Sequence, residues 1–373
     1  MNSTAARFAS RWEIPEEGAL QVRDELLIGL GQEWRKELSL SGFASAVWSP
    51  ISLGLLLLRS TGVDMTPLPE EVQSFIRSIS PQHRIELRGS NESLSRGVAC
   101  FDGRCMYLGC CDDLGSGGGH YRFQKGFDGN DRGKARVQFT VPSDWRCAGI
   151  LPVKSEDGAS WRYPESGQHE TWADLQEVRQ AIRAGWQVVT LEALVWGKGD
   201  PLGLWARRLQ EIYRSAHLCN WPKYEGVASC IRTLALHTIG AMHTPWRKET
   251  VEVLPDSPSV TLDSIQGMID GGVKVERWVD KGHLPDEYHP EWTTAIWARA
   301  RCRVLRALLR LPAELILGVR GDAVYLDGRA LDMVAALPEF QSAGECGKLR
   351  LKWYDPNPRP RVRSWSGLEP PGG

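Results

Sequence analysis

Apolar residues recur every three or four positions in the first part of the chain, which is the spacing of an amphipathic helix. Residues 16–37 show this pattern, and Ser49 followed by Pro50 predicts the start of a further helix that runs to Arg59. We therefore expect residues 1–80 to form a mostly helical N-terminal region.

The middle of the chain mixes helical and strand periods. Residues 136–153 alternate as strands do, and residues 161–196 predict a strand, a helix and a second strand. Residues 201–243 predict two helices separated by a breaker, and residues 291–310 predict one long amphipathic helix. Residues 112–135 are rich in Gly and Asp and predict a loop. Small groups of strands interrupted by helices predict an α+β fold rather than a doubly wound one.

Two apolar runs near the C-terminus flank the tripeptide Arg320-Gly321-Asp322. Glycine supplies the positive φ that a two-residue hairpin turn requires, so residues 315–328 predict a β-hairpin with the Asp322 carboxylate at its tip. An aspartate in such a place is usually a turn-former, so chemistry is inferred only if a second carboxylate has a matching setting.

A matching setting lies upstream. Residues 98–108 predict a short strand that ends at Asp102, and Tyr107 follows five positions later. Between this strand and the hairpin lies a candidate phosphate-facing helix, residues 228–240, in which Arg232 precedes a glycine by eight positions. The chain therefore carries, in order, an aspartate, an aromatic residue, a basic helix and a second aspartate.

These segments resemble the motifs of family B DNA polymerases, nearest to the exonuclease-linked polymerases of phages and linear plasmids. The resemblance covers roughly residues 80–354. It implies a right-hand polymerase, with an antiparallel palm sheet built from residues 81–200 and 246–354 and a helical fingers hairpin inserted over residues 201–245. The Pro- and Arg-rich residues 355–373 predict a flexible tail.

The resemblance implies a DNA-directed DNA polymerase, which transfers a nucleotide from a dNTP to a primer 3′-hydroxyl with two Mg²⁺ (or Mn²⁺) ions. Mg²⁺ is usually held by one or two carboxylates together with substrate phosphates. The implied catalytic residues and metal ligands are Asp102 and Asp322. The family's hairpin usually carries Asp-Thr-Asp. Here Arg320 and Gly321 replace its first two residues, while the firmer ligand is retained as Asp322.

The resemblance also implies a nucleotide-binding set. Arg232 matches the basic fingers residue that contacts the incoming triphosphate, and Arg214 on the preceding helix is a second phosphate contact. Tyr107 matches the aromatic residue that lies under the deoxyribose and excludes a 2′-hydroxyl. The family's Asn and Tyr in the basic helix are replaced by Leu236 and Ile239, which puts base-pair checking in doubt.

Four residues are implied to contact DNA. Lys352 and Tyr354 match a Lys-x-Tyr segment that holds the primer terminus, and Arg84 matches the arginine of a template-contacting segment whose two glycines are replaced here. Arg320 puts a positive charge beside the metal site, where it either lowers metal affinity or holds a primer phosphate.

Two family parts have no counterpart in the pattern. About 80 residues precede the implied palm without a recognisable exonuclease motif, and the tail is too short for a helical thumb. We therefore expect an exonuclease-deficient enzyme that acts on a primed DNA template with dNTPs. It is either distributive and error-prone by itself or dependent on a processivity or replication partner.

Composition adds few constraints. Apolar content of 42% and charged content of 24% are those of an ordinary globular protein. A net charge of −1 does not exclude DNA binding, because local basic patches matter more than the sum. The arginine-rich runs at residues 299–306 and 359–363 are candidates for such patches, or are solvated faces and tails.

Cysteine usage and hydropathy indicate a soluble, cytoplasmic protein. The nine cysteines form no C-x-x-C pair and no signal peptide is evident, which favours a reducing compartment. The cluster Cys100, Cys105, Cys110 and Cys111 fits no common zinc module. The longest apolar run, residues 51–58, is too short to cross a bilayer, so no membrane partner is expected.

Alternatives remain open at this stage. An inactive polymerase relic that binds DNA or serves as a scaffold would account for Arg320, Leu236 and Ile239. A primase-polymerase would use the same two-metal chemistry without a primer. An unrelated α+β enzyme would match the motifs by chance.

Overall fold

The computed structural model describes residues 3–38, 46–81, 84–115, 120–156, 158, 160–218, 223–245, 247–253, 265–269, 272–279, 286–340 and 345–370. For the three segments between residues 247 and 279 the structure describes the backbone alone. Within these ranges the chain combines helices with antiparallel sheets, as the sequence predicts. No helix in them is both long and apolar enough to span a membrane.

The N-terminal region is helical, as predicted. Its helices are α1 (Thr4–Trp12), α2 (Ala19–Glu33), α4 (Pro50–Arg59) and α5 (Glu70–Ser78). The Ser49 hydroxyl accepts a hydrogen bond from the Ser52 amide, and Pro50 occupies the first turn, so α4 begins where the sequence indicates. The indole of Trp12 is buried and donates to the Val47 carbonyl at 2.8 Å, which ties α1 to the segment before α4.

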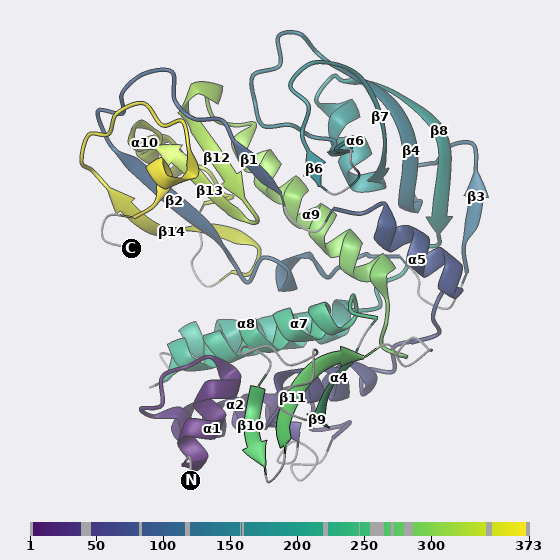
Figure 1. Cartoon of the computed structure of the whole chain (residues 1–373), viewed down its shortest axis with the longest axis vertical. Helices are drawn as coiled ribbons and strands as arrows, with labels where there is room; N and C mark the ends of the chain where they lie inside the picture. The colour runs from purple at the N-terminus through teal and green to yellow at the C-terminus, as the bar shows by residue number, and fades with distance from the viewer. Residues whose placement is uncertain are drawn as a thin grey trace.

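Two long helices lie above this region (Figure 1), α7 (Gly203–Leu218) and α8 (Tyr224–Ala241). They confirm the two helices predicted for residues 201–243, and the breaker between them falls largely outside the described residues. The contact of α8 with α4 is close: a Cβ on Gly54 would lie 1.8 Å from Oγ1 of Thr238. The glycine that interrupts the apolar run therefore permits this helix packing.

A five-stranded antiparallel sheet occupies the upper left of Figure 1. Its strands are β1 (Ile85–Leu87), β2 (Val98–Arg104), β12 (Ile316–Arg320), β13 (Ala323–Asp327) and β14 (Lys348–Asp355), in the order β1-β12-β13-β2-β14. The short helix α10 (Leu331–Val334) follows β13. The long helix α9 (Pro290–Leu308) confirms the amphipathic helix predicted before the hairpin, and it runs between this sheet and a second one.

The second sheet holds β3 (Arg122–Gln124), β4 (Arg132–Val141), β7 (Gly167–Asp174) and β8 (Gln187–Trp196), in the order β3-β8-β4-β7. Helix α6 (Leu175–Arg183) packs on it, and β5 (Val153–Lys154) pairs with β6 (Trp161–Arg162) beside it. Residues 81–200, predicted as one part of a palm, therefore divide between the five-stranded sheet, the four-stranded sheet and the small β5–β6 pair. The predicted loop at 112–135 contains β3 and the start of β4, and its glycine run at 117–119 lies outside the described residues.

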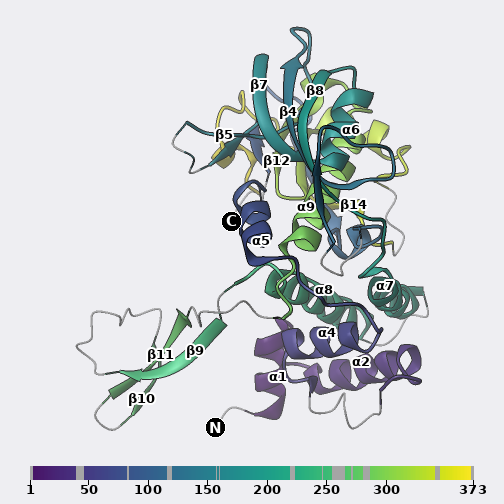
Figure 2. The ribbon, with the colours of Figure 1, turned by 90° about the vertical axis from the view of Figure 1, so that its right-hand side faces the viewer.

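A third sheet consists of β9 (Arg247–Val253), β10 (Ile265–Ile269) and β11 (Gly272–Val279). Figure 2 shows it projecting away from the helices and from the other sheets. Residues 246–354, also predicted as palm, thus begin with a separate small sheet.

The predicted flexible tail is wrong over residues 355–370. Val362 and Leu368 are buried with Leu94, Val98 and Leu317 in one apolar cluster. The Val362 amide donates to the Ser90 hydroxyl at 2.7 Å, which fixes the returning chain against the end of β1. Two apolar residues among prolines and arginines are a weak sequence signal for an ordered segment. The segment is ordered by packing against residues that are distant in the sequence.

Candidate active site

The β12–β13 hairpin places Asp322 beside β2. Gly321 has φ 66°, and Arg320 pairs with Ala323, so Gly321 and Asp322 form the two-residue turn that the sequence predicts. Strand β13 pairs with β2 with Val324 opposite Phe101, which carries the turn to the end of β2. A Cβ on Gly103 would lie 2.4 Å from Oδ2 of Asp322. Asp322 therefore approaches the backbone of β2 directly after Asp102.

The two aspartates act on one another electrostatically. Burial and, second, the negative charge of Asp102 together raise the pKa of the Asp322 carboxyl to about 6, while Arg232 and Lys352 oppose the shift. Asp102 lies on β2 and Asp322 in the β12–β13 turn, and the charge of Asp102 makes Asp322 harder to ionise. Asp322 is therefore a half-buried carboxyl beside a second carboxylate.

We expect Asp322→Asn to stabilise the metal-free protein at neutral pH. The folded pKa of about 6 lies above the unfolded value, so stability from protonated Asp322 is present in acid and is lost as the pH rises toward and through 6. The asparagine amide does not ionise, so the variant does not lose stability as the pH rises. Calorimetry at pH 8 with a chelator should therefore give the variant a melting temperature a few degrees above that of the wild type. The advantage should disappear near pH 4; an equal advantage at both pH values would contradict the assignment.

Lys352 lies on the other side of β2, on β14. Its Nζ is 3.8 Å from Oδ2 of Asp102, and its side chain is 57% exposed. The pairing of β14 with β2 shifts register between Leu351 and Trp353, which is a bulge at Lys352. Bulges re-aim a side chain, and this one places the lysine near the carboxylate. The structure thus places Lys352, which the sequence predicts as a DNA contact, beside Asp102.

A cavity of about 50 Å³ brings three predicted residues together. Tyr107, Arg232 and Asp322 line it, along with Gly103 and Cys105. Burial raises the pKa of the Tyr107 phenol to about 12, and Asp322 adds to the shift. Tyr107 lies in the turn that follows β2, immediately before the short 3₁₀ helix Leu108–Cys110, rather than on a strand. That 3₁₀ helix contacts α7, α8 and α9, so three helices hold the turn in place.

The carboxylates fit a hard divalent cation. Asp102 and Asp322 offer oxygen ligands, and the raised pKa of Asp322 indicates negative charge that a bound cation would relieve. The described residues contain no cluster of three or more His, Cys, Asp or Glu arranged to hold a metal ion, so substrate or water would complete any coordination. The four clustered cysteines at positions 100, 105, 110 and 111 carry free thiols.

Other predicted residues lie elsewhere. Arg214 is exposed on α7 and pairs with Glu211 at 2.6 Å, outside the cavity. The Tyr354 hydroxyl donates to the Arg96 carbonyl at 3.2 Å, and Tyr354 pairs with Ala99, three residues before Asp102.

Arg320 and Arg84 have opposite environments. Arg320 is exposed at the end of β12, where it can meet a ligand. Arg84 is 1% exposed, and its guanidinium donates to Glu86 at 2.5 Å and to the Gly149 carbonyl at 2.6 Å. The predicted template contact of Arg84 is therefore contradicted, because a buried guanidinium with these partners is not presented to DNA.

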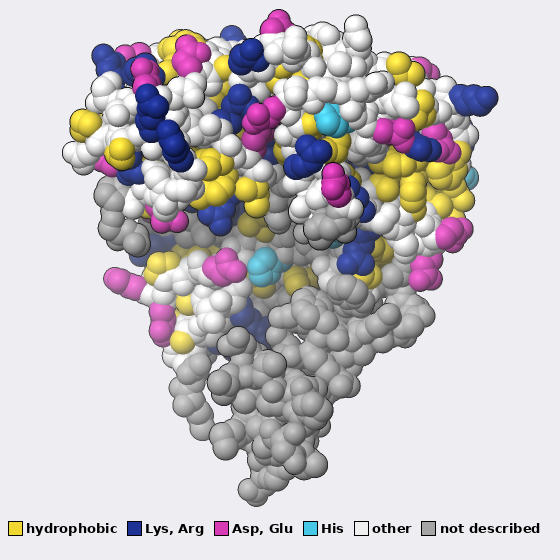
Figure 3. All heavy atoms as spheres, turned by 45° about the horizontal axis from the view of Figure 1, so that its top comes forward, with side chains coloured by type: hydrophobic (Ala, Val, Ile, Leu, Met, Phe, Trp, Pro, Cys, Tyr) yellow, Lys and Arg dark blue, Asp and Glu magenta, His cyan; other side chains and the backbone are white. Residues whose placement is uncertain are grey.

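Several arginines of the two arginine-rich runs are paired within the protein. Arg301 is buried against Glu177, Arg299 donates to the Asp113 carbonyl, and Arg359 pairs with Asp355. Figure 3 shows Lys and Arg interspersed with Asp and Glu on one face of the molecule.

Family models and curated sequences give no match to this chain. Its fold is similar to that of phi29 DNA polymerase. The ternary complex of that enzyme with primer-template DNA and incoming nucleotide substrates aligns with a TM-score of 0.60 and 11% identity over 83% of this chain and 54% of the enzyme. The orthorhombic crystal form aligns with a TM-score of 0.60 and 11% identity over 94% and 63%. The post-translocation binary complex aligns with a TM-score of 0.55 and 12% identity over 87% and 58%.

The chain thus spans a little over half the length of phi29 DNA polymerase, between 54% and 63% in these alignments. At 11–12% identity the likeness concerns the fold. The α+β class and the antiparallel sheets agree with it.

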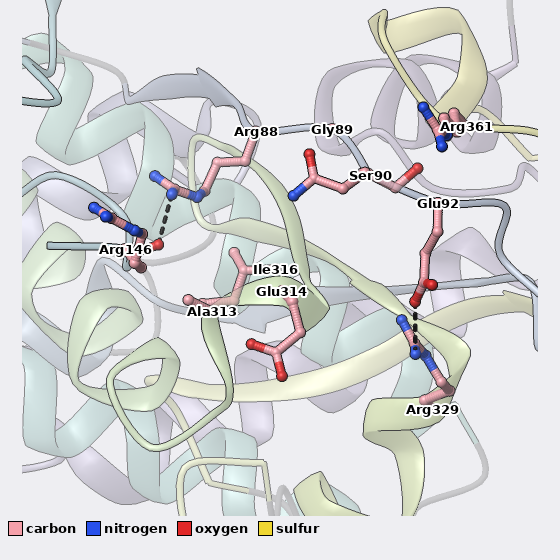
Figure 4. Close-up of a pocket in the computed structure, with 11 residues that line it drawn as sticks. Arg88, Gly89, Ser90, Glu92, Arg146, Ala313, Glu314, Ile316, Arg329 and Arg361 are labelled. Carbon is pink, nitrogen blue, oxygen red and sulfur yellow. Dashed lines mark hydrogen bonds and ion pairs between the residues drawn. The ribbon is translucent and has the colours of Figure 1, made fainter. Parts of the chain in front are cut away.

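A larger cavity of about 600 Å³ (Figure 4) is lined by neither Asp102 nor Asp322. Its lining includes Arg88, Glu92, Ile316 and Arg329, and Ile316 is at the opposite end of β12 from the turn. Glu92 and Arg329 pair at 2.9 Å across it. Cavity volume alone therefore does not single out the place where Asp102 and Asp322 meet.

Gly103 is a site residue that motif spacing does not single out. A glycine inside a strand often marks the close approach of another group, and here that group is the Asp322 carboxylate. Two further residues at the end of β2 and on β14, Arg104 and Arg350, were also missed, because each is one more charge in an arginine-rich sequence.

We expect Gly103→Ala to misplace Asp322. The added methyl would meet Oδ2 of Asp322 at 2.4 Å and Cβ of Met106 at 2.8 Å, so the carboxylate must move. Misplacing a catalytic group by about 1 Å can lower the rate of the reaction that it serves by on the order of a hundredfold. Single-turnover kinetics should show the loss while the circular dichroism spectrum stays unchanged. Gly129→Ala, where a Cβ meets nothing within 4 Å, is the matched control, and an equal loss there would refute the steric account.

Proposed function

We propose that the chain is a template-directed DNA polymerase of the family B type, with the five-stranded sheet as palm and α7–α8 as fingers. The observation that supports this most directly is the meeting of Asp322, Tyr107 and Arg232 in one cavity beside Asp102. These residues lie far apart in the sequence and have the order and roles of the polymerase motifs. The fold likeness to phi29 DNA polymerase supports the same proposal.

In this proposal Asp102 and Asp322 would hold two Mg²⁺ or Mn²⁺ ions, whose chemistry would be to activate a primer 3′-hydroxyl and to offset charge on the leaving pyrophosphate. Arg232 contacts the triphosphate with its forked guanidinium. Tyr107 lies under the deoxyribose of the nucleotide. Lys352 offsets the charge of Asp102 until substrate arrives, and its exposed ammonium then contacts the primer terminus.

The direct test is extension of a labelled primer on a DNA template with Mg²⁺ and four dNTPs. Incorporation that follows the template base at each position is the expected result. An unprimed template tests the primase alternative. DNA binding by the wild type without any incorporation would favour the scaffold alternative, for which the exposed Arg320 in place of a family aspartate is the specific observation.

We expect Arg232→Ala to lower kcat/KM for the dNTP by about ten- to a hundredfold, because a hydrogen bond to a charged group contributes about 1.5–3 kcal/mol. Arg232 is exposed on α8 and lines the cavity, so its loss should leave folding intact. Affinity for primer-template, measured by fluorescence anisotropy without dNTP, should not change. A loss confined to DNA affinity would reassign Arg232 to the nucleic acid.

A further inference from the structure

A second cavity adjoins the small one that holds Asp322. Its volume is about 380 Å³, and it shares Gly103, Cys105 and Arg232 with the smaller cavity. Three arginines from three elements line it, namely Arg104 at the end of β2, Arg350 on β14 and Arg232 on α8. The cavity thus lies between the five-stranded sheet and the helices, next to the candidate catalytic carboxylates.

The three arginines have no carboxylate partner among the described ion pairs. Nε of Arg104 is buried and has no hydrogen-bond partner there. On α7, by contrast, exposed Arg207 and Arg214 each pair with a carboxylate, at 3.0 Å and 2.6 Å. An unsatisfied buried donor is costly, so a group that accepts from it is expected.

The three positive charges act on one point of the cavity. The pKa of the Cys105 thiol is lowered, first by its hydrogen bond with Cys346 and then by Arg232, Arg104 and Arg350. The acidic residue of the lining is Glu225, which accepts from the Tyr224 hydroxyl at 3.2 Å. The cavity therefore has an excess of positive charge with its donors close together.

We propose that Arg104 and Arg350 hold the phosphates of the incoming nucleoside triphosphate from the sheet side, opposite Arg232. This inference rests on the proposed polymerase function. Guanidinium groups bind phosphate oxygens in forked pairs, and the volume is within the range of small-ligand pockets.

The register of the sheet gives these two arginines a fixed relation to the carboxylates. Arg350 pairs with Asp102, and Arg104 is two residues further along the same strand as Asp102. Because Arg104 and Arg350 lie on strands of the same sheet as Asp102, their distance to this carboxylate stays fixed even if α8 moves. The three arginines line one cavity, whereas contacts to a DNA backbone would be spread along the path of the strand. A nucleoside triphosphate therefore suits this arrangement better than a DNA backbone.

The test is calorimetric titration of the full chain with tripolyphosphate and, separately, with a dNTP and its unphosphorylated deoxynucleoside, all in a chelator. We expect tripolyphosphate and the dNTP to bind and the deoxynucleoside not to bind. Arg104→Gln and Arg350→Gln should each weaken both phosphate ligands about tenfold. Arg183→Gln, an exposed charge loss on α6, should bind like the wild type.

Unchanged tripolyphosphate binding in both variants would overturn the inference, and so would variants that lose affinity only for primer-template. Loss of dNTP binding with tripolyphosphate unaffected would also overturn it. These outcomes do not depend on primer extension. A wild type that binds triphosphate through these arginines but extends no primer would refute the polymerase proposal and leave the phosphate site standing.

Discussion

Asp322→Asn and Asp102→Asn should each reduce primer extension by at least about a thousandfold, equivalent to roughly 4 kcal/mol of transition-state stabilisation. Either amide removes one of the two negative charges that would hold the metal ions, and Asp322 is half-buried where water replaces it poorly. The measurement is single-nucleotide incorporation under single-turnover conditions, with Mg²⁺ and then with Mn²⁺. Primer-template affinity should stay within about twofold of the wild type, because neither carboxylate attracts DNA.

Asp327→Asn is the control for loss of a nearby carboxylate. Asp327 follows the same hairpin, but it is fully buried and its carboxylate pairs with Arg329 at 2.8 Å. This variant should lower thermal stability and keep the rate per folded molecule. Extension that survives either site substitution at the wild-type rate would mean that the carboxylates are assigned to the wrong residues.

The hairpin and its turn could be predicted from sequence because their determinants are local. Gly321 supplies the positive φ, the flanking apolar runs supply the strands, and Asp322 falls at the turn as expected. Helices α4 and α9 were likewise readable from a Ser-Pro start and from apolar periodicity. The pairing of β13 with β2 is different. It joins segments more than two hundred residues apart, and only the family resemblance pointed to it.

The failures have long-range causes. Arg84 reads as an ordinary basic residue, and its burial depends on Glu86 and on the Gly149 carbonyl, 65 residues away. The tail looks unstructured because Val362 and Leu368 stand among prolines and arginines, yet each completes a cluster supplied by other strands. The local composition of a segment indicates how much conformational entropy is lost when that segment becomes ordered. It does not reveal the distant residues whose packing offsets this loss.

Arg301→Met should destabilise the protein by about 3–5 kcal/mol, because it leaves the buried carboxylate of Glu177 without its partner. Nε of Arg301 donates to Oε1 of Glu177 at 2.7 Å, and Nη1 donates to the Pro81 carbonyl at 2.8 Å. The two side chains are 5% and 2% exposed, on α9 and α6. Urea denaturation followed by tryptophan fluorescence measures the loss. Arg310→Met, which breaks the exposed pair with Glu339, should cost less than about 1 kcal/mol.

The double variant Glu177→Leu with Arg301→Met measures how much the ion pair itself contributes to the free energy of unfolding. A buried ion pair gains attraction but loses hydration, so replacing both partners by apolar side chains should recover most of the stability that either single change removes. Helix α9 also contacts the 3₁₀ helix that follows β2, so a loosened α9 should lower primer extension as well, and the double variant should restore it. If the single losses simply add in the double variant, Glu177 and Arg301 are not energetically coupled, and α9 must be fixed by its apolar contacts instead.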